Sequence, residues 1–83
     1  GSKEKKEAFE KWFSLCSTTA EAREAFNNAP NSNKEETLKK WKELSAKEIE
    51  KASTVAETQE AYGNTPSGSK EEKEALKKII LLS

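Results

Sequence analysis

The chain has 83 residues, of which 36% are charged and 33% hydrophobic, and its 15 basic residues balance its 15 acidic residues. This length supports one small domain with a thin core. The charges of both signs are interspersed, without the basic stripe that nucleic-acid binders carry, and no apolar run approaches the length of a membrane span. We therefore expect neither a nucleic-acid partner nor a membrane partner.

The residue types that most often carry chemistry are scarce. The chain contains no histidine, which is the usual general base and the commonest metal ligand, and its one cysteine cannot form an internal disulfide. We expect no enzyme activity, no cofactor and no metal. Gly1-Ser2 and the absence of Met are typical of a cleaved expression product, so residues 3–83 are taken as the domain, and nothing in the sequence indicates a cellular location.

The first predicted helix covers residues 3–15, because apolar side chains recur on one face at spacings of three and four residues. These side chains are Phe9, Trp12, Phe13 and Cys16. The opposite face is filled by Lys and Glu. This pattern predicts one buried stripe and one solvated surface.

A second helix is predicted over residues 19–27. Thr18 and Glu21 match a capping box, in which each residue satisfies the other's backbone N–H at a helix start. One side of this segment is expected to carry Ala22, Ala25, Phe26 and Ala29. It should end before Pro30, with an asparagine in the left-handed cap conformation.

A third helix is predicted from about residue 34 to residue 44, opened by Ser32 and Glu35 as another capping pair, with Asn33 and Glu36 as a competing pair one residue later. Its inner face is expected to hold Leu38, Trp41, Leu44 and Ser45. Trp41 lies 29 residues after Trp12, with further matches at the same offset, so the two tryptophans are expected at equivalent positions. Residues 46–52 follow a third capping pair, Ser45 and Glu48, and form either a short extra helix or an extension of the third.

Two more helices complete the chain. Thr54 and Glu57 predict a helix over residues 55–62 that ends at Gly63 as the left-handed cap residue. Ser69 and Glu72 open the last helix, residues 70–82. No strand pattern appears, so the fold class is all-α, with five to six short antiparallel helices in a compact bundle or short solenoid.

One segment of the chain occurs twice. Residues 17–36 and 53–72 are identical at eleven of twenty positions when shifted by 36 residues. The shared unit is a helix start, a short helix ending in an aromatic residue, a polar turn with proline, and the start of another helix. We expect a helix-turn-helix unit that stacks on its own copy.

Residues 18–30, with Trp12 and Leu15 upstream, resemble a shortened tetratricopeptide hairpin. That class carries Trp and Leu on its first helix, Ala and an aromatic residue on its second, and Pro after it. The chain departs from the pattern after the leucine, where Cys16 or Ser45 replaces the expected glycine. The resemblance implies a surface for protein interaction or scaffolding.

Cys16 is a candidate nucleophile because it precedes a helix start, where a thiol pKa can fall. It also completes the apolar stripe of the first helix and has no histidine to act as its base, so a core position is the simpler interpretation.

The candidate protein-binding residues are aromatic or lie in the apolar run 79–82 at the end of the last helix. They are Trp12, Phe13, Trp41, Ile80 and Leu81. Trp12-Phe13-Ser14-Leu15 also resembles the helical Trp-Phe-x-Ile/Leu epitope of a retroviral envelope's membrane-proximal segment. The tryptophans fit a core equally well by their spacing.

The sequence thus predicts a non-enzymatic helical repeat module with a structural or protein-binding role, whose partner is another protein or a second copy bound through the terminal helices. The alternative is an engineered scaffold that presents a peptide or captures a target through Trp12, Phe13 or Trp41. The missing Met and His favour a designed origin, whereas the irregular turn over residues 27–33 favours a natural one, and both stay open.

Overall fold

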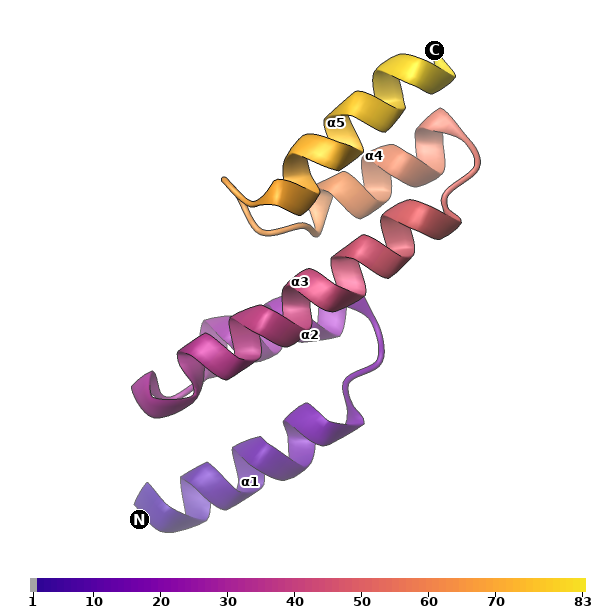
Figure 1. Cartoon of the computed structure of the whole chain (residues 1–83). Coiled ribbons are helices and arrows are strands. Elements are labelled where there is room, and N and C mark those ends of the chain that lie inside the picture. The colour runs from indigo at the N-terminus through magenta and orange to yellow at the C-terminus, as the bar shows by residue number, and fades with distance from the viewer. Residues whose placement is uncertain (1) are drawn as a thin grey trace.

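The computed structural model describes residues 2–83, and it is all-α (Figure 1). Helices account for 81% of the residues, and the described residues contain no strand. In chain order the elements are α1 (Ser2–Leu15), α2 (Thr19–Asn28), a 3₁₀ turn η1 (Asn31–Asn33), α3 (Lys34–Lys51), α4 (Val55–Gly63) and α5 (Lys70–Leu82). The all-α prediction is confirmed.

The helices form a stack that is much longer than it is wide, measuring 50 × 21 × 14 Å. Consecutive helices run in opposite directions (Figure 1). Helix α3 lies between α1 at one end and the pair α4 and α5 at the other, and α2 lies behind α3 in the view of Figure 1. Short connections leave neighbouring helices no other arrangement. Because α3 packs against helices on both sides, it is the element that joins the two ends of the stack.

Three of the predicted helix starts are confirmed. Thr18 Oγ1 accepts the Glu21 N–H at 3.2 Å, and Glu21 Oε1 accepts the Thr18 N–H at 3.2 Å. The Thr54 hydroxyl accepts the Glu57 N–H at 3.1 Å and caps α4. Ser69 does the same for α5 through the N–H of the third residue of that helix.

Two predicted capping pairs do not form. Ser45 and Glu48 lie inside α3, which runs without a break to Lys51, so the second alternative for this segment, an extension of the third helix, is confirmed. The Ser32 hydroxyl bonds to the Asn33 side chain instead of capping α3. Asn33, the first residue of the competing pair, occupies the N-cap position of α3, but without a side-chain cap hydrogen bond among the described residues. A helix continues where burial favours it, even through a sequence that could cap.

The left-handed positions were also predicted wrongly. Gly63 is the last residue of α4, and the glycine with a positive φ, +76°, is Gly68 in the following turn. None of the described non-glycine residues has a positive φ. Helix α2 ends through Ala29, whose extended backbone, with φ −69° and ψ 139°, suits the residue before Pro30.

The core is divided into two clusters. One joins Phe9 and Phe13 of α1, and Cys16 directly after that helix, to Ala25 of α2 and its C-cap residue Ala29, with Trp12 packed against the cluster. The other joins Ile49, Ala61 and Ala75 of α3, α4 and α5, with Tyr62 packed against it. Phe13 and Ile49 are 36 residues apart, as are Ala25 and Ala61, so the offset found in the sequence also relates the two clusters.

The inner face of α3 differs in part from the prediction. Its buried residues are Thr37, Trp41, Ser45 and Ile49. Leu38 and Leu44 are only half-buried. The small Thr and Ser side chains let the alanine-rich helix α2 approach α3 closely, whereas the leucines lie at the edges of the contact between α2 and α3.

Candidate functional site

The aromatic residues of α1 serve mainly the core. Phe9 and Phe13 are buried and stack with ring centroids 5.7 Å apart, and Trp12 is half-buried, edge-on to Phe9 at 5.9 Å. Phe13 also contacts Lys40, whose Nζ lies 4.6 Å from the ring centroid. Of the resembled Trp-Phe-Ser-Leu segment, Ser14 and Leu15 are the exposed members, with Leu15 65% exposed.

Trp41 lies in the middle of α3 and is not equivalent to Trp12. It is 9% exposed, its ring packs on Phe26 of α2 at 5.3 Å, and its indole N–H donates to the Asn64 carbonyl at 2.6 Å. This hydrogen bond ties the end of α4 to α3. By the 36-residue offset that relates the two core clusters, the counterpart of Trp12 is Glu48, so the expected equivalence of the tryptophans is wrong.

Cys16 is placed as a packing residue. Its Sγ lies 3.5 Å from the Trp12 carbonyl, and the side chain is 6% exposed. Burial raises the pKa of the Cys16 thiol, Glu21 raises it further, and Lys40 acts in the opposite direction. A thiol held in its protonated form is a poor nucleophile.

Ile80 and Leu81 are the two candidates that reach the surface. Each is 74% exposed near the end of α5, and Leu76 and Leu82 beside them are 43% and 40% exposed. Ile79 is half-buried. The apolar run therefore covers the preceding helices with one side only and leaves large side chains bare on the other.

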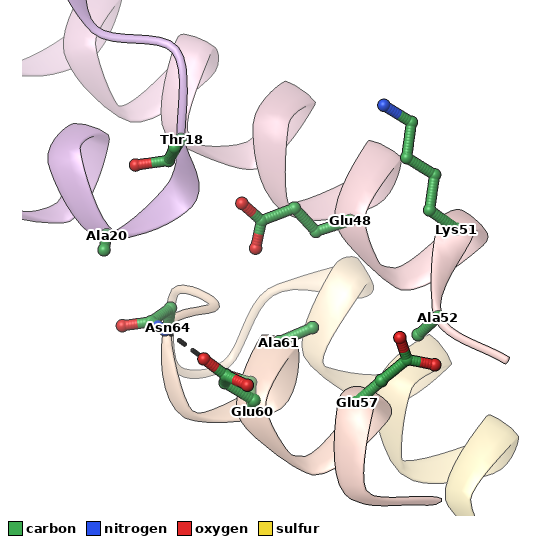
Figure 2. A pocket seen from close by; sticks show the side chains of 9 residues that line it. All are labelled: Thr18, Ala20, Glu48, Lys51, Ala52, Glu57, Glu60, Ala61 and Asn64. Atoms are coloured by element: carbon green, nitrogen blue, oxygen red, sulfur yellow. Dashed lines mark hydrogen bonds between the residues drawn. The ribbon is translucent and has the colours of Figure 1, made fainter. Parts of the chain in front are cut away.

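An open groove that the sequence did not reveal lies between α2, α3 and α4 (Figure 2). It has a volume of about 450 Å³ and is lined by alanines and charged side chains, among them Glu48, Glu57, Glu60 and Lys51. Figure 2 shows Glu48 reaching from α3 toward the start of α2, where it accepts the Thr19 N–H at 3.0 Å. Its lining residues are brought together only when these three helices pack, so no local sequence motif predicts the groove.

Several polar groups in and beside the groove make hydrogen bonds within the protein. Arg23 of α2 donates to the Gly63 carbonyl at 3.3 Å, and the Asn64 side chain donates to the Glu60 carbonyl at 3.3 Å. The pKa of Glu57 is held below its ordinary value by hydrogen bonds from the Ser53 backbone and hydroxyl. A carboxyl with a lowered pKa stays ionised and cannot act as an acid near neutral pH.

Among the described residues, no group of His, Cys, Asp or Glu side chains could hold a metal ion. Within the same residues no helix is long and apolar enough to cross a membrane. Comparison with family models, with curated proteins and with solved structures finds no match for this chain.

Proposed function

We propose that this chain is a non-enzymatic helical repeat module, tetratricopeptide-like in architecture, that acts by binding another protein or as a structural unit. The observation that supports this most is the doubled core, in which residues 36 apart occupy matching places in two stacked units. Modules built in this way generally work through extended surfaces.

The use of polar side chains supports the same proposal. Glu21, Glu57 and Ser69 cap helix starts. Lys40 and Lys78 donate to backbone carbonyls of α1 and α3, respectively. Polar groups that hold the backbone together are not arranged around a reacting centre. The repeat regularity is compatible with a designed or reconstructed origin.

Selection from a displayed library of helical peptides, with the chain immobilised, tests the proposal. We expect selected sequences to converge on a common pattern and to bind the purified chain in solution. Failure of the sequences to converge, with the immobilised chain shown to be folded by circular dichroism, would overturn a protein-binding role.

The second candidate is a scaffold that presents a peptide from α1, and the exposure of Leu15 beside half-buried Trp12 favours it. Phe13 and Trp41 lie in the core, so such presentation depends on the other face of α1. Acrylamide quenching of Trp12 in a Trp41→Phe variant tests this. Strong quenching that a captured target removes would support the scaffold, and equal quenching with and without any target would count against it.

A further inference from the structure

After its first turn, which matches that of α3 at the offset of 36 residues, helix α5 matches residues 38–45 of α3 at an offset of 38 residues. The matching positions include Leu38 and Leu76, Lys40 and Lys78, and Leu44 and Leu82. Lys40 Nζ donates to the Phe13 carbonyl near the end of α1 at 2.7 Å, and Lys78 Nζ donates to the Ile49 carbonyl near the end of α3 at 2.6 Å. The two lysines make equivalent hydrogen bonds, so Lys78 joins α5 to α3 in the same way as Lys40 joins α3 to α1.

This equivalence provides an internal comparison for the surface of α5. At the same offset Ile80 corresponds to Lys42 and Leu81 to Glu43. The α3 positions carry charges suited to water, whereas Ile80 and Leu81 are apolar and 74% exposed. Exposed apolar side chains at positions where α3 carries charged residues indicate that another molecule covers this surface of α5.

The exposed face of α5 also carries a row of lysines. Lys70, Lys73 and Lys77 are spaced by three and four residues and are all exposed, which places them on one side of the helix at 100° per residue. On that wheel Leu76 and Ile80 lie on one flank of the row and Leu81 on the other, with Glu74 at its edge.

The side chains of Lys70, Lys73 and Lys77 make no hydrogen bond or ion pair with any of residues 3–83. By contrast, the side chains of Lys34, Lys40 and Lys78 each donate to a backbone carbonyl. The outer face of α5, defined by Leu76, Ile80, Leu81 and this lysine row, is therefore apolar and positively charged. It lies at the end of the stack (Figure 1).

The charge of this face decides between possible occupants. A second copy that paired α5 with α5 would bring two lysine rows together, and like charges at an interface are unfavourable. A helix with an apolar stripe flanked by carboxylates would cover the leucine and isoleucine side chains and pair with the lysines. Building on the proposed protein-binding role, we propose that the outer face of α5 binds an acidic amphipathic helix of another protein.

A synthetic peptide of about 18 residues tests this, with leucines at i, i+3, i+4 and i+7 and glutamates on the flanks. Its controls are a scrambled peptide of the same composition and a peptide with lysine in place of glutamate. Fluorescence anisotropy should show binding of the first peptide only, weakening as salt concentration rises. Amide chemical-shift changes should map to α5.

The matched variants come from the chain itself. The double substitution Ile80→Lys with Leu81→Glu installs the residues of α3 and should weaken binding by at least about tenfold, as should Lys73→Glu with Lys77→Glu. Lys6→Glu with Lys11→Glu on α1 makes the same charge change far from α5 and should leave binding unchanged. Circular dichroism verifies that each variant is folded.

Several results would overturn the proposal. Equal affinity for the scrambled peptide, or binding that survives both α5 variants, would exclude this face. Association of the chain alone by light scattering, abolished by the Ile80→Lys and Leu81→Glu pair, would mean that a second copy covers it. Binding to anionic vesicles without binding to the peptide would assign it to a lipid surface. Library peptides that bind elsewhere would leave the module's general role intact while removing this site.

Discussion

The Ser45 hydroxyl is fully buried on the inner face of α3 and has no hydrogen-bond partner among the described residues. A buried, unpaired polar group costs free energy, and alanine also favours a helix more than serine does. Ser45→Ala should therefore raise the free energy of unfolding by about 1 kcal/mol, measured by urea denaturation. Thr37→Ala on the same face is the contrast, because the Thr37 hydroxyl donates to the Asn33 carbonyl at 2.6 Å. Its loss should destabilise the protein, and a stabilising effect of both changes would contradict this reasoning.

Glu21 makes the start of α2 sensitive to acid. Hydrogen bonds from the Ser17 backbone and the Thr18 hydroxyl hold the pKa of Glu21 below its ordinary value of 4.5. A lowered pKa in the folded state means that the stabilisation is present above pH 4.5 and is lost as the pH falls through the folded value. Thermal melts should show Glu21→Gln less stable than the parent at pH 7, with the difference shrinking in acid. Glu24→Gln, an exposed change on the same helix away from the cap, should show no such convergence.

At the scale of the elements, two lysines connect neighbouring helices: Lys40 connects α3 to α1, and Lys78 connects α5 to α3. Lys40 and Lys78 donate to the Phe13 and Ile49 carbonyls, near helix ends where the backbone accepts cations well. Replacing either with methionine keeps the length of the side chain but removes the charged hydrogen bond, so each should cost about 1–3 kcal/mol. Lys77→Met, an exposed change on α5, should be nearly neutral. Equal midpoints for all three variants in urea would show that the lysine contacts contribute nothing.

The helix boundaries show what the sequence could predict. Thr18 and Thr54 follow serine and precede another β-branched residue, a run that disfavours helix, so their capping pairs are used. Ser45 has the same partner spacing but sits among good helix formers and on the buried face between Trp41 and Ile49, and burial there extends the helix. Local patterns thus predict where a helix can begin, and packing decides whether it does.

Of the residues in the candidate binding surface, only the exposed apolar ones near the end of α5 could be predicted from the sequence. The apolar run that includes Ile80 and Leu81 was visible in the sequence, and both side chains are exposed. The charged row beside them became meaningful only once α5 could be compared with α3 in three dimensions. Similarly, the groove near Glu48 forms only when α2, α3 and α4 pack together, and residue spacing along one helix does not predict it.

At the scale of the whole molecule, the elongated stack leaves α1 held less firmly than the other helices. The radius of gyration, 14.1 Å, exceeds the roughly 12 Å expected for a compact chain of this length. Helix α1 touches the rest mainly through the cluster of Phe9, Phe13 and Cys16, while open hollows of about 570 and 470 Å³ lie along its two sides. Unfolding of one end need not disturb the other in such a stack.

Hydrogen exchange should therefore find α1 the least protected helix and the centre of α3 the most protected. Phe9→Ala removes a buried ring from the α1 cluster alone, so it should accelerate exchange throughout α1 while the amides of α4 and α5 keep their rates. The matched change Ile49→Ala, in the second cluster, should accelerate exchange in α4 and α5. If Phe9→Ala instead raised exchange equally in all five helices, the chain would unfold as one cooperative unit. Helix α3 would then couple the two ends of the stack more tightly than the two separate core clusters imply.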